Sequence, residues 1–177
     1  LCDPPYGGPA GTYGDLARFA KRVLAPGGLL LAYHGQFRLP ENLAAMQDHL
    51  EYVWTFGVFH RTTPGKIPKW KFRNSWKPVL MFGKPPGRVW WDWTMDVLAG
   101  GREKGHHEWQ QAESEAAYLI DTFCPRGGLV VDPFCGSGTV LVAARKLGRK
   151  HLGFELDPRV ADTARGRLAG APASSRR

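Results

Sequence analysis

The chain has 177 residues, 43% of them hydrophobic, and this composition suits a globular domain while excluding a fibrous or wholly disordered protein. Its apolar runs fall short of the roughly 20 residues that cross a bilayer, and its three widely spaced cysteines predict neither a disulfide framework nor a Cys-x-x-Cys metal site. The net charge of +8 is unevenly distributed, and these features together predict a cytoplasmic protein with no membrane segment.

Hydrophobic periodicity predicts helices and strands that alternate along the chain. Leu1-Cys2 is interpreted as the end of a strand that begins upstream, which predicts that the chain is N-terminally truncated. Apolar residues at helical spacing predict helices at 16–24, 41–50, 116–123, 140–147 and 161–168. Short apolar or β-branched runs predict strands at 29–33, 52–59, 79–82, 129–131 and 151–154. The stretch 84–109, rich in Pro, Gly and Trp, is expected to be irregular.

This alternation predicts an α/β fold with a mostly parallel sheet and helices on both faces. Residues 1–177 are expected to form a single domain.

A glycine-containing string lies between a predicted strand and a predicted helix. Its two glycines permit a sharp turn and a close approach of a ligand to the backbone, and the helix start supplies N–H donors. Glu155 ends the next strand, where a carboxylate can accept from the two hydroxyls of a ribose. The alternative is a purely structural turn with an exposed Glu155. The candidate ligand-binding residues in the string are Asp132, Pro133, Phe134, Gly136, Ser137, Gly138 and Thr139, with Cys135 as a filler.

A second string, Asp3-Pro4-Pro5-Tyr6, follows the expected strand end at Cys2. An exocyclic amino nitrogen of adenine or cytosine is a weak nucleophile, and acceptors that hold its two hydrogens can aim its lone pair at a methyl donor. The Asp3 carboxylate and the Pro4 carbonyl are candidates for these acceptors, and the prolines fix the backbone around them. Tyr6 offers a face on which an extruded base can stack. The alternative is a turn with two prolines.

The segment from Val53 to Trp91 contains no Asp or Glu, but it contains eight Lys or Arg residues and five Trp residues. A basic, aromatic segment suits nucleic acid, although a solvated loop with packed tryptophans would have the same composition. The candidate contacts to nucleic acid are Lys66, Lys69, Trp70, Lys71, Arg73 and Trp76. His106-His107 lacks a second ligand cluster, so no metal site is predicted.

Together the two strings resemble the amino-group DNA methyltransferases of restriction-modification and phage type. The 3–6 string looks like that family's catalytic motif, 132–139 like its cofactor loop and 154–157 like its ribose-binding strand end. The segment 107–111 is similar to the element that closes over the methionine end, which makes Gln110 a candidate cofactor contact. The order, with the catalytic motif first, is typical of the family's beta group.

The resemblance implies a Rossmann-like, class I S-adenosylmethionine-dependent methyltransferase acting on double-stranded DNA. It places a target-recognition-like insertion at about 60–109. Asp3 favours adenine N6 as the methyl acceptor, because cytosine enzymes of this family more often have Ser at that position.

Three alternatives stay open at this point. The first is a cytosine N4 DNA methyltransferase. The second is an RNA methyltransferase, which the motif order disfavours. The third is a catalytically silent nucleic-acid-binding domain of the same fold, which the two intact strings disfavour.

Overall fold

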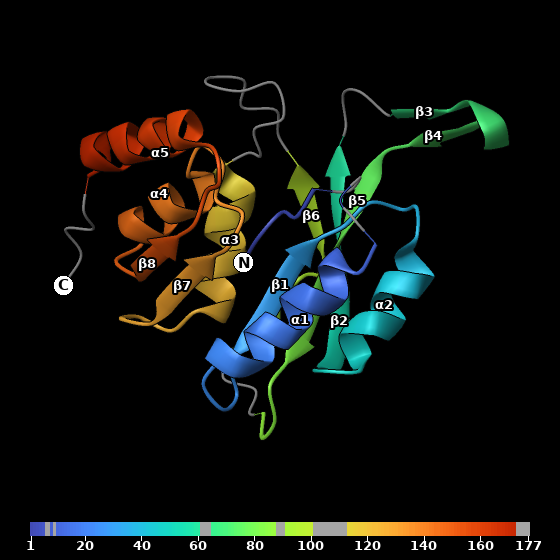
Figure 1. Cartoon of the computed structure of the whole chain (residues 1–177), viewed down its shortest axis with the longest axis horizontal. Helices are drawn as coiled ribbons and strands as arrows, with labels where there is room; N and C mark the ends of the chain where they lie inside the picture. The colour runs from blue at the N-terminus through green and yellow to red at the C-terminus, as the bar shows by residue number, and fades with distance from the viewer. Residues whose placement is uncertain (6–7, 9, 61–64, 88–90, 101–112, 173–177) are drawn as a thin grey trace. The chain divides into compact units, whose positions relative to one another are not determined.

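The computed structural model describes residues 1–5, 8, 10–60, 65–87, 91–100 and 113–172. The chain divides into two compact units. One consists of residues 3–98 and is called here the N-terminal unit; the other consists of residues 1–2 and 99–177 and is called the C-terminal unit (Figure 1).

The N-terminal unit is built on a four-stranded sheet with the order β1-β5-β2-β6. A separate two-stranded hairpin, β3–β4, belongs to the same unit. In chain order the elements of the N-terminal unit are α1 (Thr12–Val23), β1 (Leu29–Tyr33), α2 (Leu39–Gln47), β2 (Glu51–His60), β3 (Gly65–Ile67), a 3-10 turn (Pro68–Trp70), β4 (Phe72–Asn74), β5 (Trp76–Gly83) and β6 (Val97–Gly100). The last two residues of β6 fall in the C-terminal unit.

Strand β5 lies between β1 and β2 and runs antiparallel to both. Its register with β1 begins with Leu29 opposite Gly83 and ends with Tyr33 opposite Val79. Because β1 and β2 both oppose β5, they run parallel to one another, as expected for two strands joined through helix α2.

Helices α1 and α2 lie side by side on one face of this sheet (Figure 1). The amphipathic stripe of α1 faces the core, and the Tyr13 hydroxyl donates to the Tyr33 carbonyl at 2.9 Å, which ties the helix to the end of β1. Residues 78–83 of β5 are fully buried, and so are residues 30–33 of β1. The α1 residues that share this core are Tyr13, Leu16, Ala17 and Ala20.

The C-terminal unit contains a parallel strand pair and three helices. Its elements are α3 (Glu113–Phe123), β7 (Leu129–Asp132), α4 (Thr139–Lys146), β8 (Lys150–Gly153) and α5 (Pro158–Gly170). Strands β7 and β8 pair in parallel. The core between α3, β7 and α4 consists of Ala116, Ile120, Val130, Val140, Ala143 and Ala144, and Leu1 packs against it.

Most of the predicted helices and strands are present, but two predictions need correction and one element was not predicted. The sheet is mixed rather than mostly parallel, because β5 turns back against both neighbours. The stretch 84–109, predicted to be irregular, contains strand β6. The basic segment contains the hairpin β3–β4, whose three-residue strands are too short to show a periodicity. No helix in the described part of the chain has the length and apolarity to span a membrane.

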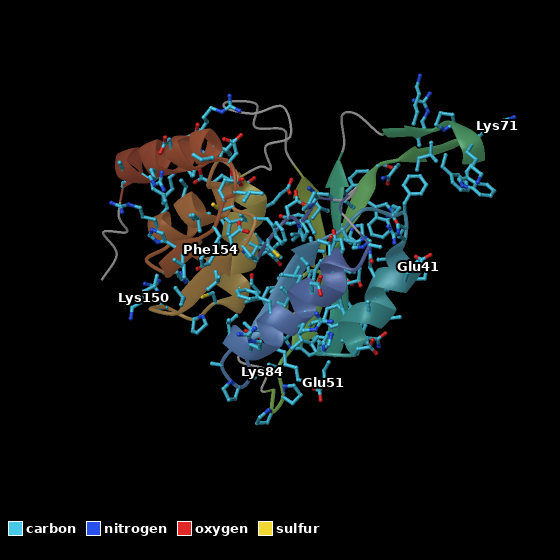
Figure 2. The ribbon with its side chains drawn as sticks, in the orientation of Figure 1. Glu41, Glu51, Lys71, Lys84, Lys150 and Phe154 are labelled. Atoms are coloured by element: carbon cyan, nitrogen blue, oxygen red, sulfur yellow. The ribbon has the colours of Figure 1, made fainter. Side chains whose placement is uncertain are left out.

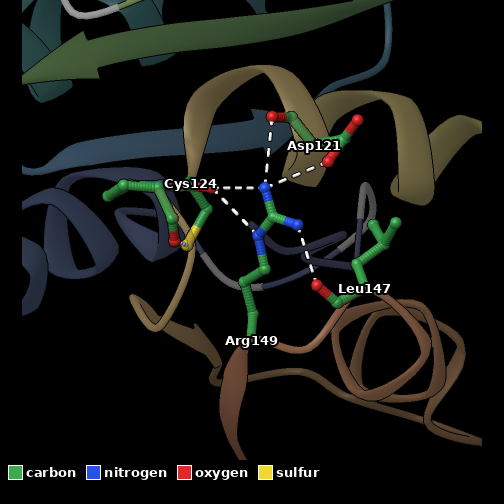
Figure 3. Close-up of polar contacts among 5 residues, drawn as sticks. Asp121, Cys124, Leu147 and Arg149 are labelled. Carbon is green, nitrogen blue, oxygen red and sulfur yellow. Dashed lines mark hydrogen bonds and ion pairs between the residues drawn. The ribbon is translucent and has the colours of Figure 1, made fainter. Parts of the chain in front are cut away.

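Arg149, between α4 and β8, joins three elements of the C-terminal unit (Figure 3). Its side chain is 5% exposed, and its guanidinium donates to the carbonyl of Cys124 from Nε at 3.0 Å and from Nη2 at 2.9 Å. It also donates to the Leu147 carbonyl at 2.8 Å. The carbonyls at a helix C-terminus have no partner within the helix, so a cation there satisfies them and complements the helix dipole. Arg149 thus caps α3 and holds it against the end of α4.

We predict that Arg149→Met lowers the free energy of unfolding by about 2–4 kcal/mol, because the buried carbonyls lose their donors. The ion pair between Arg149 and Asp121 (3.0 Å) contributes little to this, since the aspartate side chain is 64% exposed. Urea denaturation of the protein measures the change.

Arg159→Ala is the matched control, because this arginine also pairs with a carboxylate but is 92% exposed. Its loss should change the stability by no more than about 0.5 kcal/mol. Equal effects of the two substitutions would contradict the capping role of Arg149.

Candidate functional site

The glycine loop, residues 132–139, connects the end of β7 to the start of α4. The β7–β8 pairing continues into it, since the Phe154 N–H donates to the Asp132 carbonyl and the Cys135 N–H donates to the Phe154 carbonyl, at 2.9 and 3.0 Å. Asp132 is buried, and its Oδ1 accepts from the Phe134 N–H at 3.0 Å. The loop is therefore held in register with the end of β8, where Glu155 lies.

Glu155 is fixed by three backbone N–H groups. Its Oε2 accepts from Gly136 at 3.0 Å, and its Oε1 accepts from Leu156 at 2.8 Å and from Asp157 at 3.0 Å. The carboxylate thus connects the tip of the glycine loop to the turn that begins α5. Each carboxylate oxygen has two lone pairs, so Oε2 retains acceptor capacity for a ligand hydroxyl. The structure thus brings Glu155 and the glycine loop, two separate predictions from the sequence, into direct contact.

The space around the loop tip suits a ligand. Gly136 has a φ of +50°, and a Cβ built on it would meet no heavy atom within 4 Å. Phe154 and Leu156, on either side of Glu155, are 51% and 97% exposed (Figure 2 labels Phe154). An open glycine tip, a fixed carboxylate and exposed apolar side chains fit a nucleoside with a ribose diol and a flat base.

Arg167 of α5 is a loop contact that the sequence did not reveal. Its Nη1 donates to the Ser137 carbonyl at 2.7 Å, to the Ser137 Oγ at 2.9 Å and to the Thr139 Oγ1 at 3.1 Å. A Cβ built on Gly138, which has a φ of +84°, would lie 3.0 Å from the Ala164 Cβ, so α5 also packs closely on the loop. Arg167 holds the second half of the loop, as Glu155 holds the first half.

Cys135 lies inside this arrangement rather than at a reactive surface. A Cβ built on Gly153 would lie 3.0 Å from its Sγ, so only glycine lets β8 approach the thiol this closely. Burial, and then the negative charges of Asp132 and Glu155, raise the pKa of Cys135 from 9.0 to about 11. The thiol is neutral near neutral pH, in agreement with its interpretation as a filler.

The Asp3–Pro5 string opens the N-terminal unit. Asp3 is half-buried, Pro4 is fully buried, and Pro5 is exposed. The Pro5 carbonyl accepts from the Gly8 N–H at 3.0 Å, which closes a turn directly after the string. The structure therefore anchors this backbone through the ring of Pro4 and leaves part of Asp3 accessible. Tyr6 lies outside the described residues.

Five of the six predicted nucleic-acid contacts lie in the β3–β4 hairpin, and the sixth, Trp76, begins β5. All six side chains are exposed. Trp70 is 58% exposed, and the Lys69 Nζ lies 5.0 Å from the centroid of its ring. Trp76 is 41% exposed and lies beside Gly57. The structure thus gathers five of the six predicted contacts on the hairpin and places the sixth, Trp76, at the start of the next strand.

Two further predictions lie wholly outside the described residues. Gln110 and the pair His106-His107 fall in 101–112 and have no description. The described residues hold no group of three or more His, Cys, Asp or Glu side chains that could bind a metal ion.

Residues 83–166 match the model of the N6_N4_Mtase family, described as DNA methylase. YubD of Escherichia coli strain K12, named as a methylase, is 29% identical over 142 residues, which cover 76% of this chain and 59% of YubD. The match spans between 24% and 59% of the length of four curated relatives.

Solved structures share the fold. The M1.HpyAVI–SAM complex superimposes with a TM-score of 0.81 at 20% identity, over 94% of this chain and 86% of that protein. The PvuII DNA methyltransferase, named as cytosine-N4-specific, gives a TM-score of 0.75 at 18% identity over 95% and 78%. These likenesses confirm the α/β, Rossmann-like methyltransferase fold.

We predict that alkylation of Cys135 by iodoacetamide at about pH 8 is on the order of 100-fold slower in the folded protein than in denaturant, because only the thiolate reacts. The rate in the folded protein should rise about tenfold per pH unit up to about pH 10, since the pKa lies above this range. Peptide mass spectrometry follows the modification, with Cys135→Ser to assign the peptide. Levelling of the rate near pH 9 would contradict the raised pKa.

Proposed function

This chain belongs to the amino-group DNA methyltransferases, and on that premise we propose that it transfers a methyl group from S-adenosylmethionine to adenine N6 in double-stranded DNA. The observation that carries the proposal is the Glu155 carboxylate, fixed by the Gly136 N–H at 3.0 Å at the open tip of the glycine loop. The setting proposed for this reaction is the cytoplasm.

The donor fits the residues of the glycine loop. Glu155 accepts from the ribose hydroxyls, and Phe154 and Leu156 cover the faces or edges of the adenine ring. Asp132, at the end of β7, accepts from the donor's ammonium group. Arg167 acts through Ser137 and Thr139 and keeps the loop in the binding conformation. When bound, S-adenosylmethionine supplies an electrophilic methyl group on a sulfonium. The other contacts that we assign to it are Pro133, Phe134, Gly138 and, outside the described residues, Gln110.

The acceptor base is held by the Asp3–Tyr6 string. Asp3 accepts one amino hydrogen and the Pro4 carbonyl accepts the other, so the nitrogen lone pair is directed away from both. Burial of the Pro4 ring keeps these acceptors in place, and no ordering is required when the base arrives. Pro5 carries the chain into the turn with Gly8, and Tyr6 stacks on the base. As the N–C bond forms, the S–C bond to the methyl group breaks and the neutral thioether is the leaving group. The Asp3 carboxylate would then accept the extra proton of the methylated amino group and pass it to water.

The DNA backbone is held by the exposed cations of the hairpin. In the described structure no carboxylate forms an ion pair with Lys66, Lys69, Lys71 or Arg73. The segment that contains them has no acid of its own, so its field attracts phosphate without internal compensation. Trp70 and Trp76 add stacking faces to this basic surface.

Cytosine N4 is the second candidate acceptor. The likeness to the PvuII enzyme, named as cytosine-N4-specific, supports it. Both bases present an exocyclic amino group with two hydrogens, so the same pair of acceptors suits either. We favour adenine because of the aspartate at position 3.

We predict that Asp3→Ala lowers the rate of methyl transfer by about 100-fold or more, the scale for losing one preorganised polar contact in a transition state. Asp3→Asn should retain more activity than Asp3→Ala, because its amide keeps one acceptor oxygen. Transfer of labelled methyl groups to unmodified genomic DNA measures the rate without knowledge of the recognition sequence. Unchanged transfer by folded Asp3→Ala would contradict the assignment.

Glu155→Ala is the matched control, because it removes a carboxylate from the proposed donor site. It should weaken binding of S-adenosylmethionine by about 1–3 kcal/mol in calorimetry, whereas Asp3→Ala should retain most of this binding. If Asp3→Ala loses donor binding as completely as Glu155→Ala, its lowered rate reports on the donor and not on the base.

A further inference from the structure

The β3–β4 hairpin has two chemically different faces. Its register places Lys66 opposite Arg73, and Ile67 opposite Phe72. Directly opposed residues of an antiparallel pair share a face, and successive residues alternate between faces. One face is therefore basic, and the other is apolar.

The tip of the hairpin adds a second exposed aromatic side chain, Trp70, close in sequence to Phe72. The 3-10 turn Pro68–Trp70 ends at Lys71, whose φ of +55° is in the left-handed region and whose N–H donates to the Pro68 carbonyl at 3.2 Å. Trp70 and Phe72 flank Lys71 and are 58% and 68% exposed. Figure 2 shows Lys71 at the end of the hairpin, away from the four-stranded sheet of its unit.

Within the described part of the chain, Trp70 and Phe72 remain mostly exposed and are not part of a buried core. The hairpin forms its own two-stranded sheet, and an isolated hairpin of this size is marginally stable in water. A folded protein gains no burial energy from two aromatic rings that remain mostly in solvent. The apolar face suits a flat, apolar surface that a partner supplies.

We propose that the apolar face of the hairpin is a wedge that enters the DNA base stack beside the extruded base, while the basic face holds the phosphates. This inference rests on the proposed function and adds the residues that keep the duplex open. Phe72 and Trp70 stack on the bases exposed at the opened step, and Lys66 and Arg73 bind the backbone on the opposite face of the same hairpin.

The positive charge around the apolar face favours DNA as the partner that covers it. The apolar residues are within one position of Lys66, Lys69, Lys71 or Arg73 in the sequence, and residues 53–91 contain no acid. A protein partner with a purely apolar patch would leave these cations uncompensated, whereas a nucleic acid presents stacking faces and phosphates within a few ångströms of one another.

The test compares two 30-base-pair duplexes of the same sequence, one intact and one with a single abasic residue that opens the stack. The unmodified protein should bind the abasic duplex about tenfold more tightly, because the wedge enters it without unstacking a base. Phe72→Ala and Trp70→Ala should lose this preference and keep the salt dependence of binding. The double variant Lys66→Ala/Arg73→Ala should keep the preference and flatten the slope of log K against log salt by about 2.

Phe37→Ala is the matched control, because Phe37 is 66% exposed but lies outside the hairpin. It should change neither the preference nor the slope. Phe72→Trp should restore the preference that Phe72→Ala loses, which separates stacking from misfolding.

Three outcomes would overturn the wedge. The first is equal binding of the two duplexes by the unmodified protein. The second is a Phe72→Ala variant that retains the preference. The third is a change in sedimentation of the DNA-free protein on Phe72→Ala, which would make the apolar face a contact between two copies of the chain. A failure of the proposed function is distinct from these, since it would appear as absence of methyl transfer to adenine by the unmodified protein, whichever duplex it binds.

Discussion

The hydrogen bond from the Gly136 N–H to the Glu155 carboxylate is the contact on which the C-terminal unit's chemistry depends. It joins the tip of the glycine loop to the end of β8, and the same carboxylate accepts from Leu156 and Asp157 at the turn into α5. Asp157 in turn caps α5 by accepting from the Arg159 N–H, a contact that lowers the pKa of Asp157. Because α5 carries Arg167 back onto the loop, the loop is held from both ends. A binding site of this kind is largely formed before its ligand arrives.

The two units divide the tasks of the proposed reaction between different kinds of structure. The C-terminal unit offers a rigid strand–loop–helix connection with a fixed carboxylate, which suits recognition of one small molecule. The N-terminal unit offers a proline-anchored acceptor string and a projecting hairpin, which suit a large, repetitive polyanion. Within the N-terminal unit, positive charge is concentrated in the acid-free stretch 53–91, which contains eight Lys or Arg residues. In the proposed reaction, the preformed loop would bind the donor, and the exposed cations and rings would bind the DNA.

The sequence predicted the regular core well, because buried faces leave a periodic pattern. The stripe of α1 and the apolar run of β1 are examples: both lie where periodicity placed them. The direction of a strand within the sheet cannot be predicted in this way, because a strand buried on both faces has the same composition in either orientation. The antiparallel course of β5 was therefore not predicted. Strand β6 was missed because four residues among Pro, Gly and Trp carry no detectable period.

The sequence predicted those parts of the candidate site whose residues form short local motifs. The glycine loop and Glu155 were found because strand-end chemistry has a local signature. Arg167 and Arg149 were not, because their partners lie many residues away and any surface arginine has the same local pattern. The hairpin's basic side chains were found from charge, while Phe72 became visible only through the register that places it opposite Ile67.

The most direct measurement is the identity of the methylated base. The protein is incubated with unmodified genomic DNA and S-adenosylmethionine carrying an isotope-labelled methyl group, and the DNA is digested to nucleosides for mass spectrometry. The label is predicted in N6-methyladenine. Label in N4-methylcytosine would replace adenine with the second candidate base, and absence of label from both amino-methylated bases would contradict the proposed function.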